Sequence, residues 1–205
     1  TTWRIEDTYD LFEASYDFSG AGLDVTHTRR IVFVRPRLWV MTDTLSGEGL
    51  RTIERNFQCA AGCEVEAGES THTLVAANGA RLQLFDFGPE LSAEVVEGQT
   101  EYPGSTIGGG QINSWINGGR GWSSRVFDRD FRPDRNSTAP APALVVSGEV
   151  ELPTSIVSVM VPTRPEEPAV TDCRWDGETL EVRRADATNL LVRFRDGVPV
   201  SASTD

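Results

Sequence analysis

The sequence predicts an all-β protein, an antiparallel β-sandwich of two packed sheets with about 10–13 strands and little or no helix. No window of about 11 residues repeats apolar positions at helical spacing without a Gly, Pro or β-branched interruption. Short runs rich in β-branched and aromatic residues fill the chain instead, and turn dipeptides separate them. About ten strands need two packed sheets to cover their apolar faces.

The first predicted hairpin joins a strand over Thr28 to Val34 with a strand over Leu38 to Asp43. Between them lies Arg35-Pro36-Arg37, where the proline presets the turn dihedral and supplies no ladder donor. A further strand is predicted over Leu50 to Cys59, with apolar residues on one alternating face and Arg55 interrupting that face.

The second predicted hairpin joins Thr71 to Ala76 with Ala80 to Phe87. Asn78-Gly79 lies between them, and these residues tolerate the positive φ angles of a type I′ turn. Ser92 to Val96 is the next predicted strand.

The remaining strands are predicted in the second half of the chain, over Leu144 to Leu152, Thr154 to Val161, Cys173 to Trp175, Thr179 to Arg183 and Leu190 to Arg195. Pro153 is expected at a strand end or edge because it has no N–H to donate. Asp176-Gly177 and Asp196-Gly197 mark turns.

We expect one β-sandwich domain over residues 1–205, with a long Gly- and aromatic-rich segment at 98–142. Segments of this length without regular structure are uncommon unless functional. This segment carries a net charge of +1, so an anionic ligand meets its least repulsive surface here. Two interpretations stay open: a ligand platform, or two further strands over Gln111 to Ile116 and Gly121 to Phe127 with their aromatic residues in the core.

The composition excludes several classes of function. Asp and Glu number 31 against 19 basic residues, and the resulting net charge of -12 opposes binding to nucleic acid or to an anionic membrane surface. All 19 basic residues are Arg, which excludes chemistry that needs a lysine amine, such as a P-loop lysine or a Schiff base. The longest apolar runs have four residues, far short of the roughly 20 that a transmembrane helix needs.

The chain starts at Thr1 without a Met or a targeting stretch, so we expect a mature piece or an excised domain. Its three cysteines leave at least one thiol unpaired within the chain. Cys59 and Cys63 would lie roughly 13 Å apart in an extended strand, whereas a turn between them would permit a disulfide clip. Their spacing, without a second pair, is a weak signal for zinc.

Two histidines could act as a general base or a metal ligand. His72 lies between threonines on a predicted strand and is expected to be an exposed surface residue. His27 begins the first hairpin and could be oriented by Asp24 or Asp43, although a structural role is the commoner one for such a histidine. No Gly-x-Ser-x-Gly motif is present, so a hydrolase built on a nucleophile elbow is not supported.

Several segments, taken in order, resemble the C-terminal β-sandwich of the heparinase II/III-like polysaccharide lyases. The main match is the run HTRRIVFV at 27–34 followed by LWVMTDTLSG at 38–47, which is similar to the family's His and Arg pair, aliphatic strand, aromatic-led strand and Gly-containing turn. Two later blocks, at 121–124 and 152–162, also look like the family. Phe57-Gln58 departs from the family's usual Phe-His. The resemblance runs from about Trp3 to Pro165.

The resemblance implies a fold and an activity. Members of this family join an N-terminal (α/α) toroid to the sandwich and cleave uronate-containing polysaccharides by β-elimination. Their reactive groups come chiefly from the toroid and from a His-rich stretch that also binds zinc, and we expect that stretch upstream of Thr1. We therefore assign no catalytic residue and no metal ligand within this chain, and we expect no cofactor in this segment.

The resemblance also implies partners and a location. We expect an acidic polysaccharide and an upstream (α/α) toroid domain or chain as partners, no nucleic acid or membrane, and a secreted or periplasmic bacterial protein. Four residues are predicted to contact the substrate: His27, Arg30, Trp115 and Trp122.

Two alternatives from other classes stay open. One is a non-catalytic carbohydrate-binding sandwich, in which Trp115, Trp122 and Tyr102 stack on sugar rings, and the other is a purely structural module. If the domain had chemistry of its own, His27 with Tyr9 or Tyr16 would be the set that offers a base and an acid.

Overall fold

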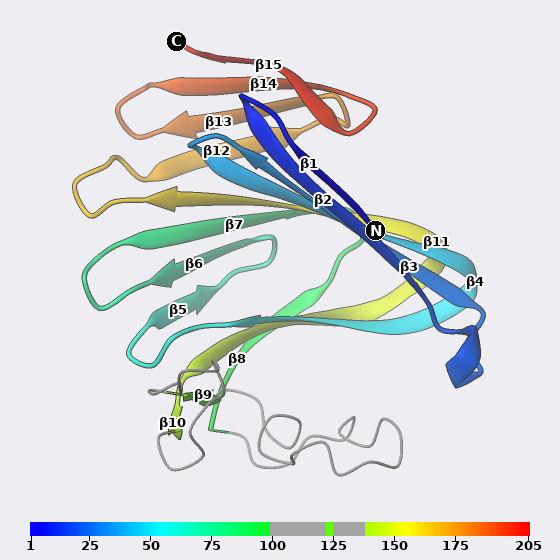
Figure 1. Cartoon of the computed structure of the whole chain (residues 1–205). Helices are drawn as coiled ribbons and strands as arrows, with labels where there is room; N and C mark the ends of the chain where they lie inside the picture. The colour runs from blue at the N-terminus through cyan, green and yellow to red at the C-terminus, as the bar shows by residue number, and fades with distance from the viewer. Residues whose placement is uncertain (99–121, 125–137) are drawn as a thin grey trace.

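The computed structural model describes residues 1–98, 122–124 and 138–205. These residues are almost entirely β-strands, and every strand pairing is antiparallel. In the described part of the chain the helical structure is one short 3₁₀ turn, Ser19–Ala21. The predicted antiparallel β-sandwich is therefore confirmed (Figure 1).

Nine strands form the large sheet. In spatial order they are β1 (Thr2–Ile5), β2 (Tyr9–Asp17), β3 (Val25–Val34), β4 (Leu38–Gln58), β11 (Pro142–Thr163), β7 (Arg81–Phe87), β6 (Thr71–Val75) and β5 (Glu64–Ala67), with β8 (Ser92–Glu97) paired to the first half of β11. β7 and β8 share one edge of β11, at opposite ends of that strand.

Four C-terminal strands form the second sheet, in the order β12 (Val170–Trp175), β13 (Thr179–Arg184), β14 (Asn189–Arg195) and β15 (Val198–Thr204). A small separate ladder pairs β9 (Trp122–Ser124) with β10 (Thr138–Pro140). β9 falls within the strand predicted at Gly121 to Phe127, and the strand predicted at Gln111 to Ile116 lies outside the described residues.

β4 and β11 are single long strands of 21 and 22 residues, where the sequence predicted two shorter strands for each. They pair along almost their whole length, and the register shifts between Leu152 and Thr154. The prediction that Pro153 ends a strand or lies at an edge is wrong, because the proline lies at this shift, where its missing N–H costs no ladder bond. On the partner strand, Gly47 and Gly49 have φ angles of +135° and +77°, which let β4 bend at the same place.

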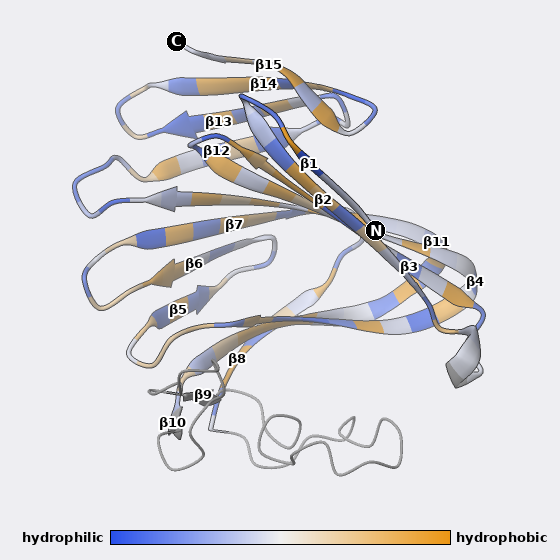
Figure 2. Cartoon of the chain, viewed as in Figure 1, coloured by the Kyte–Doolittle hydropathy of each residue, from blue (hydrophilic) through white to orange (hydrophobic). Residues whose placement is uncertain are grey.

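The first hydrophobic core lies between the large sheet and the C-terminal sheet. Val32 and Val34 of β3 pack there with Leu180, Val192 and Phe194. Buried and less buried residues alternate at the end of β3 and along the first part of β13, as expected when a strand has one covered face. Figure 2 shows hydrophobic and hydrophilic residues interspersed along the strands.

The second core forms where the long β4 and β11 ribbon bends. It contains Leu45 and Ile53 from the two sides of the bend in β4, and Val146 and Ile156 from the two sides of Pro153 in β11. Leu84 of β7 closes it. The large sheet therefore covers part of its own face, and this position sets the environment of the candidate site.

The observed turns confirm most of the predicted hairpins. β3 and β4 meet at Arg35-Pro36-Arg37, and β6 and β7 meet around Asn78-Gly79, as predicted. The type I′ assignment for Asn78-Gly79 is wrong, because only Gly79 has a positive φ. Asp196-Gly197, between β14 and β15, has positive φ at both residues, which a type I′ turn requires.

The three cysteines Cys59, Cys63 and Cys173 carry free thiols, so the disulfide clip considered for Cys59 and Cys63 does not form. Cys59 is buried, and burial together with the neighbouring Cys63 raises the pKa of its thiol to about 11. Within the described residues we find no helix of the length and apolar character that a membrane span requires.

Candidate functional site

A charged cluster lies on the face of β3 that is turned away from the C-terminal sheet. His27 and Arg29 share this face because successive side chains of a strand alternate. Arg29 is directly opposite Asp43 of β4 in the ladder. His27 Nε2 lies 2.7 Å from Asp43 Oδ1, and Arg29 donates from Nε to Oδ1 at 2.6 Å and from Nη2 to Oδ2 at 3.0 Å. Of the two acids considered for orienting His27, Asp43 is the one in contact.

Asp43 is ionised at neutral pH despite its burial. Burial opposes ionisation, but the hydrogen bonds from His27 and Arg29 and the charge of Arg55 outweigh it and lower the pKa of Asp43 to about 2. An ionised carboxylate only accepts hydrogen bonds, so His27 Nε2 carries the proton that points at Asp43. In the neutral imidazole, Nδ1 is then left as an acceptor.

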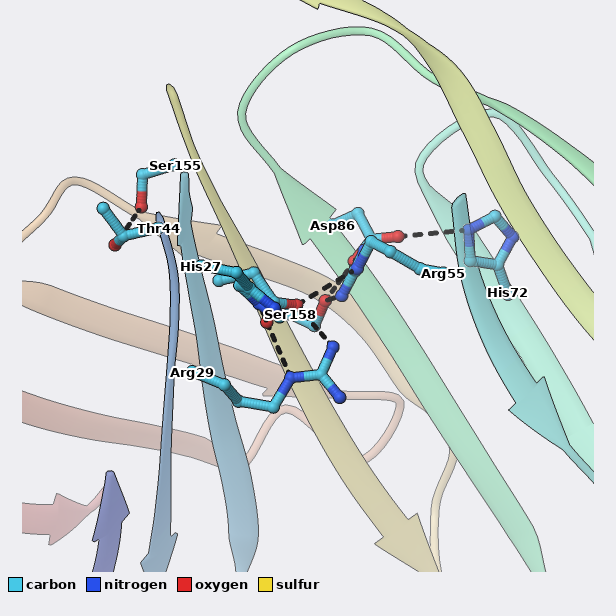
Figure 3. Close-up of polar contacts among 9 residues, drawn as sticks. His27, Arg29, Thr44, Arg55, His72, Asp86, Ser155 and Ser158 are labelled. Carbon is cyan, nitrogen blue, oxygen red and sulfur yellow. Dashed lines mark hydrogen bonds and ion pairs between the residues drawn. The ribbon is translucent and has the colours of Figure 1, made fainter. Parts of the chain in front are cut away.

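The cluster continues into the molecule through Arg55 of β4, whose side chain is 5% exposed. Arg55 Nε lies 3.4 Å from Asp43 Oδ2, and Nη1 donates to Asp86 Oδ1 at 3.0 Å. Arg55 Nη2 also donates to the hydroxyl of Ser158, which in turn donates to Asp86 (Figure 3). One guanidinium group thus connects the buried carboxylate of Asp43 in β4 with the partly buried carboxylate of Asp86 in β7.

His72 lies at the inner end of this network, and the prediction that it is exposed is wrong. Its side chain is 0% exposed, and Nε2 lies 3.5 Å from Asp86 Oδ2 (Figure 3). At that distance the contact is long for a hydrogen bond, and neither ring nitrogen has a hydrogen-bond partner in the described structure. The flanking threonines point to the opposite face of β6, so they carry no information about His72.

Asp86 has a lowered pKa, although burial by itself would raise it. The nearby His72, the charge of Arg55 and the hydroxyl of Ser158 together favour its carboxylate form. Arg55, Asp86 and Ser158 therefore form a compensated polar group inside the second core.

A pocket of about 280 Å³ opens beside this cluster. Its polar lining comes from His27, Arg29, Asp43, Arg51, Glu54 and Arg55. Most of its surface is apolar and is formed by side chains that include Phe18, Leu23, Val25, Leu45, Ile53 and Ile156. The side chains of His27 and Arg29 are 28% and 40% exposed, so the pocket reaches solvent at their end.

Arg30, another predicted substrate-binding residue, lies on the opposite face of β3 from His27. Its Nε donates to Glu13 Oε2 at 2.6 Å, and its Nη1 donates to the carbonyl of Asp196 at 3.0 Å. Arg30 thus links the large sheet to the turn between β14 and β15.

Trp115 and Trp122 are the remaining two residues that were predicted to contact the substrate. Trp115 lies outside the described residues, and the structure describes only the backbone of Trp122, in β9.

Of the two tyrosines considered beside His27, Tyr16 is directly opposite it in the ladder between β2 and β3. Tyr16 is largely exposed and packs edge-on against Phe18. Tyr9 is opposite Val34 and packs against the first core, so pairing Tyr9 with His27 is wrong.

The zinc that the family resemblance implies does not fit this cluster. In the ranges that the structure describes, no three or more His, Cys, Asp and Glu side chains gather in a way that could hold a metal ion. Both carboxylate oxygens of Asp43 already face guanidinium groups, whose positive charge repels a cation. Zinc ligands upstream of Thr1 stay a prediction.

Two members of the network were missed by sequence reasoning. Asp86 stands in an otherwise largely apolar strand, Arg81–Phe87, and a charge in such a run is the signal that could have drawn attention to it. Ser158 carries no such signal, because serine is tolerated at many strand positions.

Comparison with known proteins supports the fold. No protein-family model and no curated protein matches this sequence. Among solved structures, a heparan sulfate lyase HepC mutant from Pedobacter heparinus matches 98% of this chain at 13% identity, with a TM-score of 0.63. A second structure, heparan sulfate lyase HepC from Pedobacter heparinus, matches 94% of this chain at 14% identity, with a TM-score of 0.62. A heparinase III gene product matches 95% at 16% identity, with a TM-score of 0.57.

The match is partial on the side of those proteins. This chain spans 27%, 28% and 27% of the heparinase III, mutant HepC and HepC chains, about a quarter of their length. The matched region is their C-terminal part. The chain therefore has the fold of the C-terminal β-sandwich of heparinase III-type lyases.

Proposed function

We propose that this chain is the β-sandwich part of a polysaccharide lyase that cleaves a uronate-containing glycan by β-elimination. The observation that carries this proposal is the match of 94–98% of the chain to the C-terminal part of three solved lyase chains. Those chains are about four times as long as the matched region, so an upstream (α/α) toroid is proposed to supply the reactive groups.

The chemistry of β-elimination explains why a partner is needed. The uronate carboxylate must be neutralised so that the C5 proton becomes acidic, a base must remove that proton, and an acid must protonate the departing glycosidic oxygen. Asp43 already accepts from His27 and Arg29, and Arg55 is enclosed in the core. The cluster therefore offers groups that can hold a substrate, and we assign no catalytic residue to it.

His27 is the predicted substrate-binding residue that the geometry supports best. Asp43 fixes its ring, its Nδ1 is an acceptor in the neutral imidazole, and it lines a pocket that reaches solvent. Contact of Trp115 and Trp122 with the glycan is kept as a proposal, whereas the bonds of Arg30 to Glu13 and Asp196 suit a structural role. A secreted or periplasmic location is proposed because polymeric acidic glycans are found outside the cytoplasm.

The test is an assay of the chain alone and of the chain fused to an upstream helical segment from its parent protein. On an unsulfated uronate polymer, the fused protein is expected to release a product whose new double bond absorbs in the ultraviolet, and the chain alone is expected to release none. Absence of product from the folded fusion would contradict the proposal. Glycan binding without product would favour the carbohydrate-binding alternative.

A further inference from the structure

The pocket beside His27 has a charge balance that differs from the rest of the molecule. The pocket is lined by three arginines, Arg29, Arg51 and Arg55, and by two carboxylates, Asp43 and Glu54. Its charged side chains therefore carry an excess of positive charge, in a chain whose net charge is -12. Bound anions are favoured where a concave, partly desolvated surface carries the opposite sign. The pocket is therefore suited to an acidic ligand.

Among these three arginines, Arg51 is the one whose charge is uncompensated. Arg29 is held by both oxygens of Asp43, and Arg55 lies between Asp43 and Asp86. In the part of the chain that the structure describes, Arg51 forms no ion pair, its Nη1 donates only to the carbonyl of Leu50 at 2.8 Å, and its buried Nε has no hydrogen-bond partner. A buried guanidinium N–H without an acceptor is costly, and a carboxylate would satisfy it.

The rest of the pocket limits how many charged groups a ligand can bring. The walls are mainly the side chains of Val25, Leu45, Ile53 and Ile156, and the volume of about 280 Å³ suits one sugar ring. The C–H face of a ring can pack on such walls. A sulfate group would have to leave water and lie against apolar carbon or near Asp43, and both are unfavourable.

We propose that this pocket binds one uronate ring of an unsulfated acidic glycan, with Arg51 pairing with the carboxylate and His27 Nδ1 accepting a hydrogen bond from a ring hydroxyl. The inference rests on the proposed function for the choice of a sugar acid, and it goes beyond that function by naming the recognition groups and the preference against sulfate. The solved chains of similar fold include heparan sulfate lyases, so this preference sets the present chain apart from them.

The experiment is a calorimetric and NMR titration of the chain as it exists with three probes: an unsulfated glucuronate-containing disaccharide, the same disaccharide carrying sulfate, and neutral cellobiose. The unsulfated acid is expected to bind at least about tenfold more tightly than either other probe. Equal binding of cellobiose would overturn the role of the carboxylate. Equal or tighter binding of the sulfated probe would overturn the preference against sulfate.

Variants locate the interaction. Arg51→Gln is expected to weaken the binding of the unsulfated acid about tenfold or more and to leave cellobiose unaffected. Arg51→Lys keeps the charge but loses the planar pair of donors, so an intermediate loss is expected and covers the case in which the glutamine variant does not fold. The matched control is Arg174→Gln, because Arg174 is an exposed arginine paired with Asp172 on the other sheet. An unchanged affinity in a folded Arg51 variant would overturn the assignment.

Failure of this inference and failure of the proposed function give different results. If the fused protein releases unsaturated product and the Arg51 variants bind substrate normally, the lyase proposal stands and the pocket assignment fails. If the chain binds the unsulfated acid through Arg51 and the fused protein releases no product, the pocket assignment stands and the lyase proposal fails.

Discussion

The two hydrophobic cores of this molecule differ in what they enclose. The core between the two sheets is built mainly from aliphatic and aromatic side chains, such as Val32, Leu180 and Phe194, and its buried polar side chain Gln83 is uncharged and hydrogen-bonded to the backbone of Val170. The core inside the bend of β4 and β11 surrounds Arg55, Asp86 and His72, whose side chains are nearly or fully buried. Both cores are covered by strands of the same large sheet.

The two cores contribute to the stability of the fold in different ways. Apolar packing needs no partner groups, whereas each buried charge must be compensated by another charge or by hydrogen bonds. A sandwich can be held together by apolar packing alone. The second core instead keeps charged groups that position Asp43 and, through it, His27 at the edge of a pocket. Buried polar groups retained at such a cost are a mark of a functional region.

The largest expected effect comes from breaking the charged network of the second core. Arg55→Ala leaves Asp43 and Asp86 without their shared guanidinium and is expected to lower the free energy of unfolding by about 3–5 kcal/mol. Chemical denaturation measures this loss. Arg174→Ala, which removes an exposed pair, is the control and is expected to cost less than about 1 kcal/mol. Similar losses in the two variants would show that the network is not energetically coupled.

A somewhat smaller effect is expected in the apolar core. Leu180→Ala removes a side chain that is 0% exposed between the two sheets, and it is expected to cost about 3 kcal/mol. Because no charge is involved, this loss should be the same at pH 5 and pH 8, which denaturation at both values tests. A loss that changes with pH would mean that the two cores are not independent.

The smallest expected effect is a loss of stability at acid pH, which comes from Asp43 beside the second core. The pKa of Asp43 is lowered to about 2 from the usual 3.8, so its contribution of about 2 kcal/mol is present above about pH 4 and is lost as the pH falls through about 2. Urea denaturation across this range measures the loss. Asp43→Asn is expected to be less stable at neutral pH and to show a shallower acid limb. If the free energy of unfolding of Asp43→Asn falls with decreasing pH as steeply as that of the unchanged chain, Asp43 is not the group responsible.

The sequence predicted the elements of the fold better than their continuity. Turn residues marked the hairpins at Pro36 and Gly79, because proline and glycine restrict or release the backbone locally. Alternation could not show that the segments on either side of Gly49 or Pro153 join into single strands, because a bent strand with a register shift has the same local signals as two strands.

The candidate site was predicted only in its local part. His27 and Asp43 could be connected from the sequence because His27 directly precedes one strand of the predicted hairpin and Asp43 ends the other. Arg55 was noticed as a charge on an apolar face, without a partner. His72 was predicted to lie on the surface. Its burial depends on the pairing of β6 with β7 and on which face of the sheet is covered, and the residues next to it in the sequence indicate neither.

Local sequence signals predicted the β class, the hairpins and the family resemblance, since these depend on backbone preferences and on alternation over a few residues. Three features came from the folded chain: β4 and β11 bend the large sheet over its own face, Asp43, Arg55 and Asp86 meet there, and Arg51 lines a pocket. The interactions behind these two sets of features act over different separations along the chain. Strand preference acts between neighbours, whereas compensation of buried charge joins residues that are far apart in the chain.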